Sequence, residues 1–151
     1  MSTPSRHGVA VGMTGTRHPI TEAQRIWLGG QILTAAELRH GACVGADEAG
    51  HQAAIAAGVP IVVHPPVDER LMVTRDHHGR WLTPKPYLDR NRDIVDAVDR
   101  VIGLPDGPPR RGSGTWYTIE YAVCSGKPVL VCFPDGTVMP GDTALRLRAG
   151  Y

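Results

Sequence analysis

The sequence lacks the features that would mark a membrane protein, a secreted protein or a strongly basic nucleic-acid binder. No apolar run approaches the roughly 20 residues that a membrane-spanning helix needs. Segment 1–8 is polar and has no apolar core of the kind found in signal peptides. The net charge of +1 gives no strong general field toward DNA or an anionic membrane, although a local basic patch can still form. We therefore expect a cytoplasmic protein without a membrane partner.

Cysteine is scarce as well. The three cysteines, Cys43, Cys124 and Cys132, form no Cys-x-x-Cys motif, and an odd number leaves one unpaired in any disulfide scheme. Buried, reduced thiols are therefore the expected state, and the pattern argues against a disulfide framework.

The sequence also lacks a recognisable metal-binding pattern and the common catalytic motifs. His40, His64, His77 and His78 lack the spacing of a helical ligand pair, and no cysteine or carboxylate cluster completes a site, so we expect no metal. The chain has no Walker lysine, no Gly-x-Gly-x-x-Gly fingerprint and no Ser-His-Asp order. These absences argue against a kinase, an NTPase or a standard dehydrogenase, and we expect no resident cofactor.

The sequence does contain the alternating pattern of an α/β domain. Its 151 residues, 42% hydrophobic and 21% charged, suit one globular domain over 1–151. Thr21 is the expected N-cap of the first helix and Gly58 the expected C-cap of the second. Periodicity and turn residues predict strands over 8–12, 37–40, 60–64, 100–104 and 129–133, and helices over 22–33, 46–57, 86–97 and 113–125.

Strands that alternate with helices predict a Rossmann-like three-layer α/β/α sandwich whose mainly parallel sheet has about five strands. Uninterrupted apolar runs, such as those in 60–64 and 129–133, belong in a sheet that is covered on both faces. Segments 67–85 and 137–151 show no clear pattern, and we expect 67–85 to be a flexible excursion from the sheet.

Three loops that follow predicted strands are rich in small and polar residues. Ligands of open parallel sheets bind at the carboxyl ends of the strands, so these loops should share one site. The residues expected to bind the ligand are Thr14, Gly15, Thr16 and Arg17 in the first loop, His40, Gly45 and Asp47 in the second, and Gly112, Ser113, Gly114 and Thr115 in the third.

Each loop has both a functional and a purely structural interpretation. Glycine lets the backbone approach a ligand, hydroxyls and Arg17 suit a phosphate, and a helix N-terminus attracts an anion. Asp47 can accept hydrogen bonds from a ribose or a base, or it can simply cap the second helix. Arg17 can equally be a solvated surface charge. The convergence of three such loops favours a phosphate or nucleotide pocket.

The pair Arg90 and Asn91 begins a helix and is also open to two interpretations. Spacing alone favours a solvated helix face on which Asp89 and Asp93 partly offset the positive charge. In the functional interpretation, Arg90 and Asn91 face the pocket and bind phosphate or ribose.

Four segments occur in a characteristic order: Met13–Arg17, His40–Asp47, Arg90–Val95 and Gly114–Thr118. Together they resemble the SLOG superfamily of Rossmann-like proteins, which includes the Lonely-guy phosphoribohydrolases and the DNA-processing protein of natural transformation. The resemblance covers about residues 9–136. It implies a nucleotide site built by the first loop, the Arg-Asn helix and the Gly-x-Gly-Thr loop. Relatives are commonly dimers, so we expect a homodimer.

The resemblance also shows one departure that bears on activity. Thr118 stands where the Lonely-guy motif has its catalytic glutamate, and Arg110-Arg111-Gly112 replaces Pro-Gly-Gly. Glu120 lies two residues further on, about 200° away around a helix of 3.6 residues per turn. Because glycosidic cleavage needs a carboxylate beside the sugar, Asp47 or Asp76 would have to serve. The closer likeness is to an uncharacterised branch with Gly-Thr-Trp-x-Thr.

Three functions follow from these residues. The first is binding of a nucleotide or a nucleotide-derived phosphate ligand, which the threonine at position 118 favours. The second is a nucleoside 5′-monophosphate N-glycosidase, with Arg90, Asp47 and Glu120 as candidate catalytic residues. The third is single-stranded nucleic-acid binding. The only sequence features that support it are Arg110 and Arg111, which lie near Trp116 and Tyr117.

Overall fold

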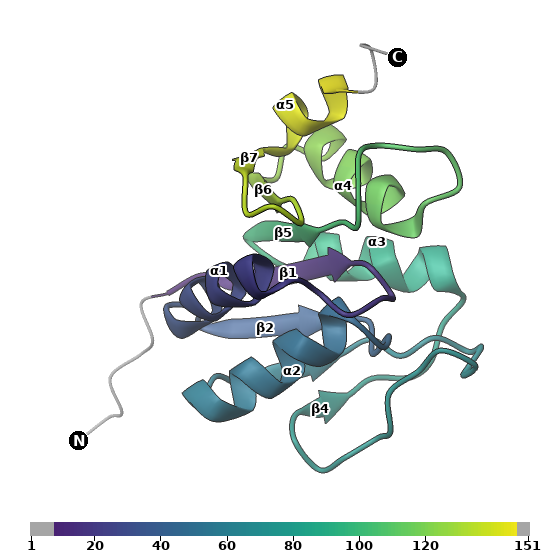
Figure 1. The fold of residues 1–151 in the computed structure, drawn as a ribbon. Coiled ribbons are helices and arrows are strands. Elements are labelled where there is room, and N and C mark those ends of the chain that lie inside the picture. Colours follow the sequence, from purple (N-terminus) through teal and green to yellow (C-terminus); the bar gives the residue numbers. More distant parts are fainter. Residues whose placement is uncertain (1–7, 148–151) are drawn as a thin grey trace.

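The computed structural model describes residues 8–147, which form one twisted sheet of seven strands with helices on both faces (Figure 1). The strand order is β4-β3-β2-β1-β5-β6-β7, and all pairs are parallel except the antiparallel pair β6 and β7. The strands are β1 Ala10–Gly15, β2 Glu37–His40, β3 Ile61–Val63, β4 Arg80–Trp81, β5 Arg100–Leu104, β6 Val129–Cys132 and β7 Val138–Pro140.

The helices divide the core into two parts, one on each face of the sheet. They are α1 Glu22–Leu33, α2 Ala46–Ala57, α3 Tyr87–Ala97, α4 Gly114–Cys124 and α5 Gly141–Arg146. On one face, Leu28 of α1 and Ala54 of α2 are buried in the same apolar cluster. On the other face, Val95 of α3 and Ile119 of α4 are buried in a second cluster. The three-layer α/β/α architecture predicted from the sequence is therefore confirmed.

The sheet has two more strands than the five that the sequence predicted. β4 is a two-residue strand inside the patternless excursion, and it pairs with β3 through Val63 and Trp81. β7 lies in the unassigned C-terminal segment and runs antiparallel to β6. Both are short edge strands, and two or three residues carry no measurable period. Of the segment 137–151, residues 148–151 lie outside the described part.

Local capping explains why the helices begin and end where they do. Thr21 caps α1 through a capping box with Gln24, as its position predicted. Gly58 ends α2 in the left-handed conformation at φ +69°, also as predicted. Within residues 8–147 we find no helix long and apolar enough to cross a membrane.

Candidate functional site

The candidate site lies where the chain switches direction across the sheet. β1 connects through α1 to β2 on one side, whereas β5, on the other side of β1, continues to β6. The carboxyl ends of β1 and β5, at Gly15 and Leu104, therefore border a crevice of the kind in which open α/β sheets bind ligands. The Thr16 N–H donates to the Leu104 carbonyl at 2.9 Å, which fixes the start of the β1 loop at this crevice. β1 extends to Gly15, so Thr14 belongs to the strand rather than to the loop.

A cavity of about 260 Å³ occupies this crevice, and we call it the phosphate cavity. It abuts the first turn of α4, where the Ser113 hydroxyl accepts a hydrogen bond from the Trp116 N–H at 3.2 Å. The N–H groups of Gly114 and Thr115 make no hydrogen bond to any residue in the described range. Open N–H groups at a helix N-terminus attract anions. The cavity is lined by Gly15, Thr16, Arg17, His18, Tyr87, Asp106, Arg110, Gly112, Ser113, Gly114 and Thr115.

Glycine at position 114 has a packing reason that the sequence does not reveal. A Cβ at this position would overlap the hydroxyl and ring of Tyr87, the first residue of α3. Gly114 therefore lets the N-termini of α3 and α4 meet, and it places Tyr87 in the wall of the phosphate cavity.

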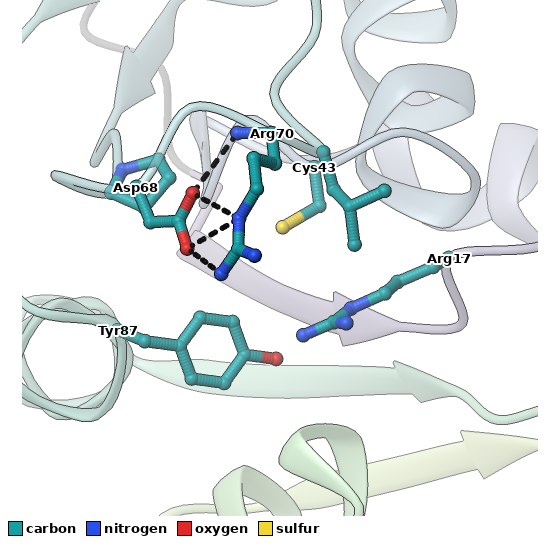
Figure 2. A pocket seen from close by; sticks show the side chains of 7 residues that line it. Arg17, Cys43, Asp68, Arg70 and Tyr87 are labelled. Atoms are coloured by element: carbon teal, nitrogen blue, oxygen red, sulfur yellow. Dashed lines mark hydrogen bonds and ion pairs between the residues drawn. The ribbon is translucent and has the colours of Figure 1, made fainter.

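A second cavity, of about 470 Å³, adjoins the first and shares Arg17 and Tyr87 with it; we call it the aromatic cavity. Figure 2 shows Arg17, Arg70, the Cys43 sulfur and the Tyr87 ring pointing toward one space. The carboxylate of Asp68 accepts from the Arg70 guanidinium at 2.6–3.1 Å. These hydrogen bonds lower the pKa of Asp68 to about 2. The remaining lining residues are Pro66 and Leu71.

Arg17 carries the uncompensated positive charge at the junction of the two cavities. Its guanidinium lies 5.5 Å from the centroid of the Tyr87 ring, and it forms no ion pair within residues 8–147. Arg70 is neutralised by Asp68, and Arg110 by Asp106 at 2.7 Å. Among the described arginines that line the cavities, Arg17 is therefore the one without an ion pair, and it lines both of them.

Arg90 is a buried structural cation, which contradicts the solvated-face interpretation. Only 2% of the residue is exposed. Its Nη1 donates to the Gly41 carbonyl and, at 3.0 Å, to the His64 carbonyl, while Nη2 donates to the Cys43 sulfur at 3.3 Å. The prediction failed because tertiary packing places this turn of α3 beneath the carboxyl ends of β2 and β3. Arg90 therefore clamps the loops that follow these two strands.

Asn91 and Thr14 are also buried, with 6% and 9% of each residue exposed, and neither lines either cavity. Side chains alternate along a strand, so Thr14 points to the same face as Gly12. A Cβ at Gly12 would meet Ile94 of α3, so Thr14 faces α3 as well. The Asn91 side chain makes no hydrogen bond to any described residue.

Side chains of the same segment bind the first three N–H groups of the loop after β2. The Asp47 carboxylate accepts from the N–H groups of Gly41 and Cys43 at 3.1 and 3.3 Å, and the Ala42 N–H donates to His40 Nδ1 at 2.9 Å. Burial raises the pKa of Asp47, against the opposing effects of Arg90 and the two N–H groups. Asp47 is not the cap of α2, and its buried Oδ1 has no hydrogen-bond partner among the described residues.

Two more predicted residues of the β2 loop serve the fold rather than the cavity walls. His40 is fully buried, and both of its ring nitrogens are hydrogen-bonded, to Ala42 and to His51. Gly45 is the N-cap of α2 at φ +90°, and a Cβ there would overlap the backbone of the β1 loop around Arg17. Gly45 therefore positions Arg17.

The residues considered for glycosidic cleavage are not placed for it. Thr118 is buried, and its hydroxyl donates to the Gly114 carbonyl at 2.8 Å within α4. Glu120 is on the exposed side of α4 and lines neither cavity. Asp76 accepts a hydrogen bond from His51 at 2.9 Å. Of residues 8–147, no group of three or more His, Cys, Asp or Glu is arranged to hold a metal ion.

Sequence reasoning missed several residues of the cavity walls. Tyr87 lies in the first turn of α3, three residues before Arg90, and a single aromatic residue at this position forms no recognisable motif. Asp68 and Arg70 lie in the excursion 67–85, which has no periodic pattern. Backbone hydrogen bonds between this segment and the loop after β2 bring them to the site. Asp106, His18 and Cys43 likewise gain their positions from the fold, and Arg110, which the sequence suggested only for nucleic-acid binding, lines the phosphate cavity.

The comparisons with known proteins place the fold. No protein-family model and no curated protein matches the chain. A molybdenum cofactor binding protein from Rippkaea orientalis is similar, with a TM-score of 0.67 and 19% identity over 95% of this chain and 97% of that chain. TM1055, a structural-genomics target, has a TM-score of 0.62 and 22% identity over 80% of this chain and 71% of that chain.

DNA processing protein A from Streptococcus pneumoniae is also similar, with a TM-score of 0.62 and 20% identity over 83% of this chain and 50% of that chain. The chain thus shares the Rossmann-like fold of these structures, as the sequence resemblance implied. Identities this low show the fold and leave the ligand open.

Proposed function

We propose that the protein binds a small phosphate ester of nucleotide type, with the phosphate in the phosphate cavity and the organic part in the aromatic cavity. The observation that carries this proposal is the junction of the two cavities at Arg17 and Tyr87. A ligand that crosses the junction meets open helix N–H groups at one end and an aromatic wall at the other.

The charges of the walls support a single phosphate group. Two of the three arginines that line the cavities are ion-paired, to Asp68 and Asp106, and only Arg17 is free to neutralise an anion. A guanidinium beside a helix N-terminus binds phosphate through charge-assisted hydrogen bonds. The part of the ligand in the aromatic cavity should therefore be uncharged and planar, so that it can stack on Tyr87.

The site supports binding better than hydrolysis. Glycosidic cleavage needs a carboxylate that can stabilise an oxocarbenium-like transition state. Asp47 is buried and lines neither cavity, and Asp106, which lines the phosphate cavity, is paired with Arg110. Among the similar structures, one is a molybdenum cofactor binding protein and another shows a single-stranded DNA binding mode, so the fold supports ligand binding in other chains.

The experiment that tests the proposal is calorimetry with a panel of nucleoside 5′-monophosphates, the matching nucleosides and inorganic phosphate. Arg17→Gln should weaken binding of the best monophosphate about 10- to 100-fold, because one charge-assisted hydrogen bond is worth about 1.5–3 kcal/mol. Its nucleoside should lose little affinity. Arg146→Gln, which changes an exposed arginine on α5, is the matched control.

Two outcomes would contradict parts of the proposal. If no member of the panel binds, or if Arg17→Gln has no effect, the phosphate site is elsewhere. Mass spectrometry of the same mixtures checks for free base, and base release from one monophosphate would replace the binding function with a phosphoribohydrolase activity.

A homodimer belongs to the same proposal. Ile26 and Leu33 are seven residues apart on one face of α1, and each is 69% exposed. Apolar side chains that share one exposed face are typical of subunit interfaces. Light scattering should give a dimer for the wild type and a monomer for the Ile26→Glu/Leu33→Glu variant. A monomeric wild type would contradict this part of the proposal.

A further inference from the structure

A chain of hydrogen bonds runs from the loop after β2 to the surface of the excursion 67–85. The Ala42 N–H lies 2.9 Å from His40 Nδ1, and His40 Nε2 lies 2.9 Å from His51 Nδ1. His51 Nε2 then lies 2.9 Å from the carboxylate of Asp76. His40 and His51 are almost fully buried, whereas 30% of the Asp76 side chain is exposed.

One backbone group fixes the direction of this whole chain. An amide N–H can only donate, so His40 Nδ1 must accept, and the proton of neutral His40 sits on Nε2. That proton points at His51 Nδ1, which must also accept, so the proton of His51 sits on Nε2 and faces Asp76. Both imidazoles are therefore neutral Nε2–H tautomers, and they end at a carboxylate.

An additional proton cannot enter the closed chain. A proton on Nδ1 of His51 would face the Nε2–H of His40, and a proton on Nδ1 of His40 would face the Ala42 N–H. Burial and the nearby charges of His51, Arg90 and His64 lower the pKa of His40 to about 3, with Asp76 opposing them. Once the chain opens to water, an imidazole takes up a proton near pH 6.5.

The chain holds a strained loop against the wall of the aromatic cavity. Ala42 is the one non-glycine residue in the described range with positive φ, at +62°. Its N–H is held by His40, and its carbonyl accepts from the Val73 N–H at 2.8 Å. The Val44 N–H donates to the Leu71 carbonyl at 2.9 Å. Segment 67–76, which brings Asp68, Arg70 and Leu71 to the cavity, is thus fastened to the β2 loop.

We propose that His40 and His51 are positioning residues that latch segment 67–76, through Asp76, over the aromatic cavity, and that acid releases this latch and weakens ligand binding. The part that concerns ligand affinity rests on the proposed function. The latch itself rests on the hydrogen-bond geometry alone.

The first experiment examines the latch without a ligand. Imidazole ¹⁵N NMR at pH 7.5 should show His40 and His51 as neutral Nε2–H tautomers. Below about pH 6.5, amide protection of Val44 and Val73 should fall up to about tenfold per pH unit for each imidazole that opening exposes. Protection of Ile102 in β5 should not follow. A different tautomer, a charged imidazole at pH 7.5, or unchanged Val73 protection at pH 5 would overturn the proposal.

Three variants separate the latch from general stability. Asp76→Ala removes the acceptor and should lower Val73 protection at pH 7.5 by roughly tenfold or more, because hydrogen bonds to charged groups are strong. Asp76→Asn keeps an acceptor oxygen and should restore most of the protection. His77→Gln changes the neighbouring exposed imidazole and should behave as the wild type. Equal protection in all three would contradict the latch.

The second experiment measures affinity for adenosine 5′-monophosphate at pH 7.5 and pH 5.5. Asp76→Ala should bind adenosine 5′-monophosphate several-fold more weakly than the wild type at pH 7.5. The further loss of affinity between pH 7.5 and pH 5.5 should be smaller in Asp76→Ala than in the wild type and in His77→Gln. Because the ligand titrates identically in every sample, only the difference between proteins counts. If the wild type binds and Asp76→Ala matches it at both pH values, the regulation is absent. If no monophosphate of the panel binds while the NMR results hold, the latch stands and the proposed function fails.

Discussion

At the scale of single residues, one side chain's neighbours decide whether it binds a ligand or holds the fold. Arg17 and Arg90 are both arginines near the site, yet the first is exposed at the cavity junction and the second is 2% exposed. Arg90 Nη1 donates to the Gly41 and His64 carbonyls, and the side chain lines neither cavity.

This difference predicts the result of Arg90→Met. The substitution leaves the Gly41 and His64 carbonyls buried without donors, so the free energy of unfolding should fall by about 3 kcal/mol or more. Urea denaturation measures this loss. Arg92→Met, which removes a partly exposed arginine paired with Asp89, should cost less than about 1 kcal/mol. Equal losses would mean that Arg90 is not a clamp.

Gly114 provides a second test at this scale. Gly114→Ala pushes a methyl group into Tyr87, so it should cost about 1–3 kcal/mol of stability and weaken monophosphate binding. Gly107→Ala, in the loop that leads to α4, meets no atom within 4 Å and is the matched control. Full affinity in a folded Gly114→Ala protein would show that Tyr87 does not need its place in the wall.

At the scale of elements, the sequence predicted the helices that have local signals, which are periodicity in α3 and caps in α1, α2 and α4. Thr21 and Gln24 lie three residues apart, and their reciprocal hydrogen bonds at 3.1 Å follow from that spacing. β4 and β7 were missed because strands of two and three residues carry no measurable period, and only their pairing with β3 and β6 defines them. Asp68 and Arg70 were missed for a related reason, since the excursion brings them to the cavity from a segment without periodicity.

The capping box carries a prediction of its own. Thr21→Ala removes the acceptor for the Gln24 N–H and the donor to the Pro134 carbonyl at 2.7 Å. The free energy of unfolding should fall by about 1–2 kcal/mol, as measured by denaturation. Thr21→Ser retains the hydroxyl and should recover most of that loss. If serine and alanine cost the same, the hydroxyl is not what stabilises the start of α1.

At the scale of the whole molecule, two buried histidines make stability depend on pH. Burial, followed by His51, Arg90 and His64, lowers the pKa of His40 to about 3. Burial, followed by Arg39, lowers the pKa of His64 to about 4. In the unfolded chain both titrate near 6.5, so below that pH the unfolded state binds more protons. Stability is therefore complete above pH 6.5 and is lost as the pH falls toward the folded values.

The expected loss is up to about 1.4 kcal/mol per pH unit for each histidine, beginning below pH 6.5. Urea denaturation at pH 7.5, 6 and 5 covers a range in which most carboxylates stay ionised. His64→Gln should reduce the slope between pH 6 and 5. A free energy of unfolding that is the same at pH 7.5 and pH 5 would contradict the neutral burial of His40 and His64.

The sequence by itself determined what depends on neighbours along the chain. Periodicity, caps and glycine turns were enough for the helices from α1 to α4, for the parallel core strands, and for the meeting of Arg17 with Gly114 at one sheet edge. Tertiary structure alone decided which polar groups remain open. Asp47 and His40 were expected to bind a ligand, but Asp47 Oδ2 accepts from the N–H groups of Gly41 and Cys43, and His40 Nδ1 accepts from the N–H of Ala42. Which polar atoms the fold pairs, and which it leaves open, depends on contacts that no local sequence pattern encodes.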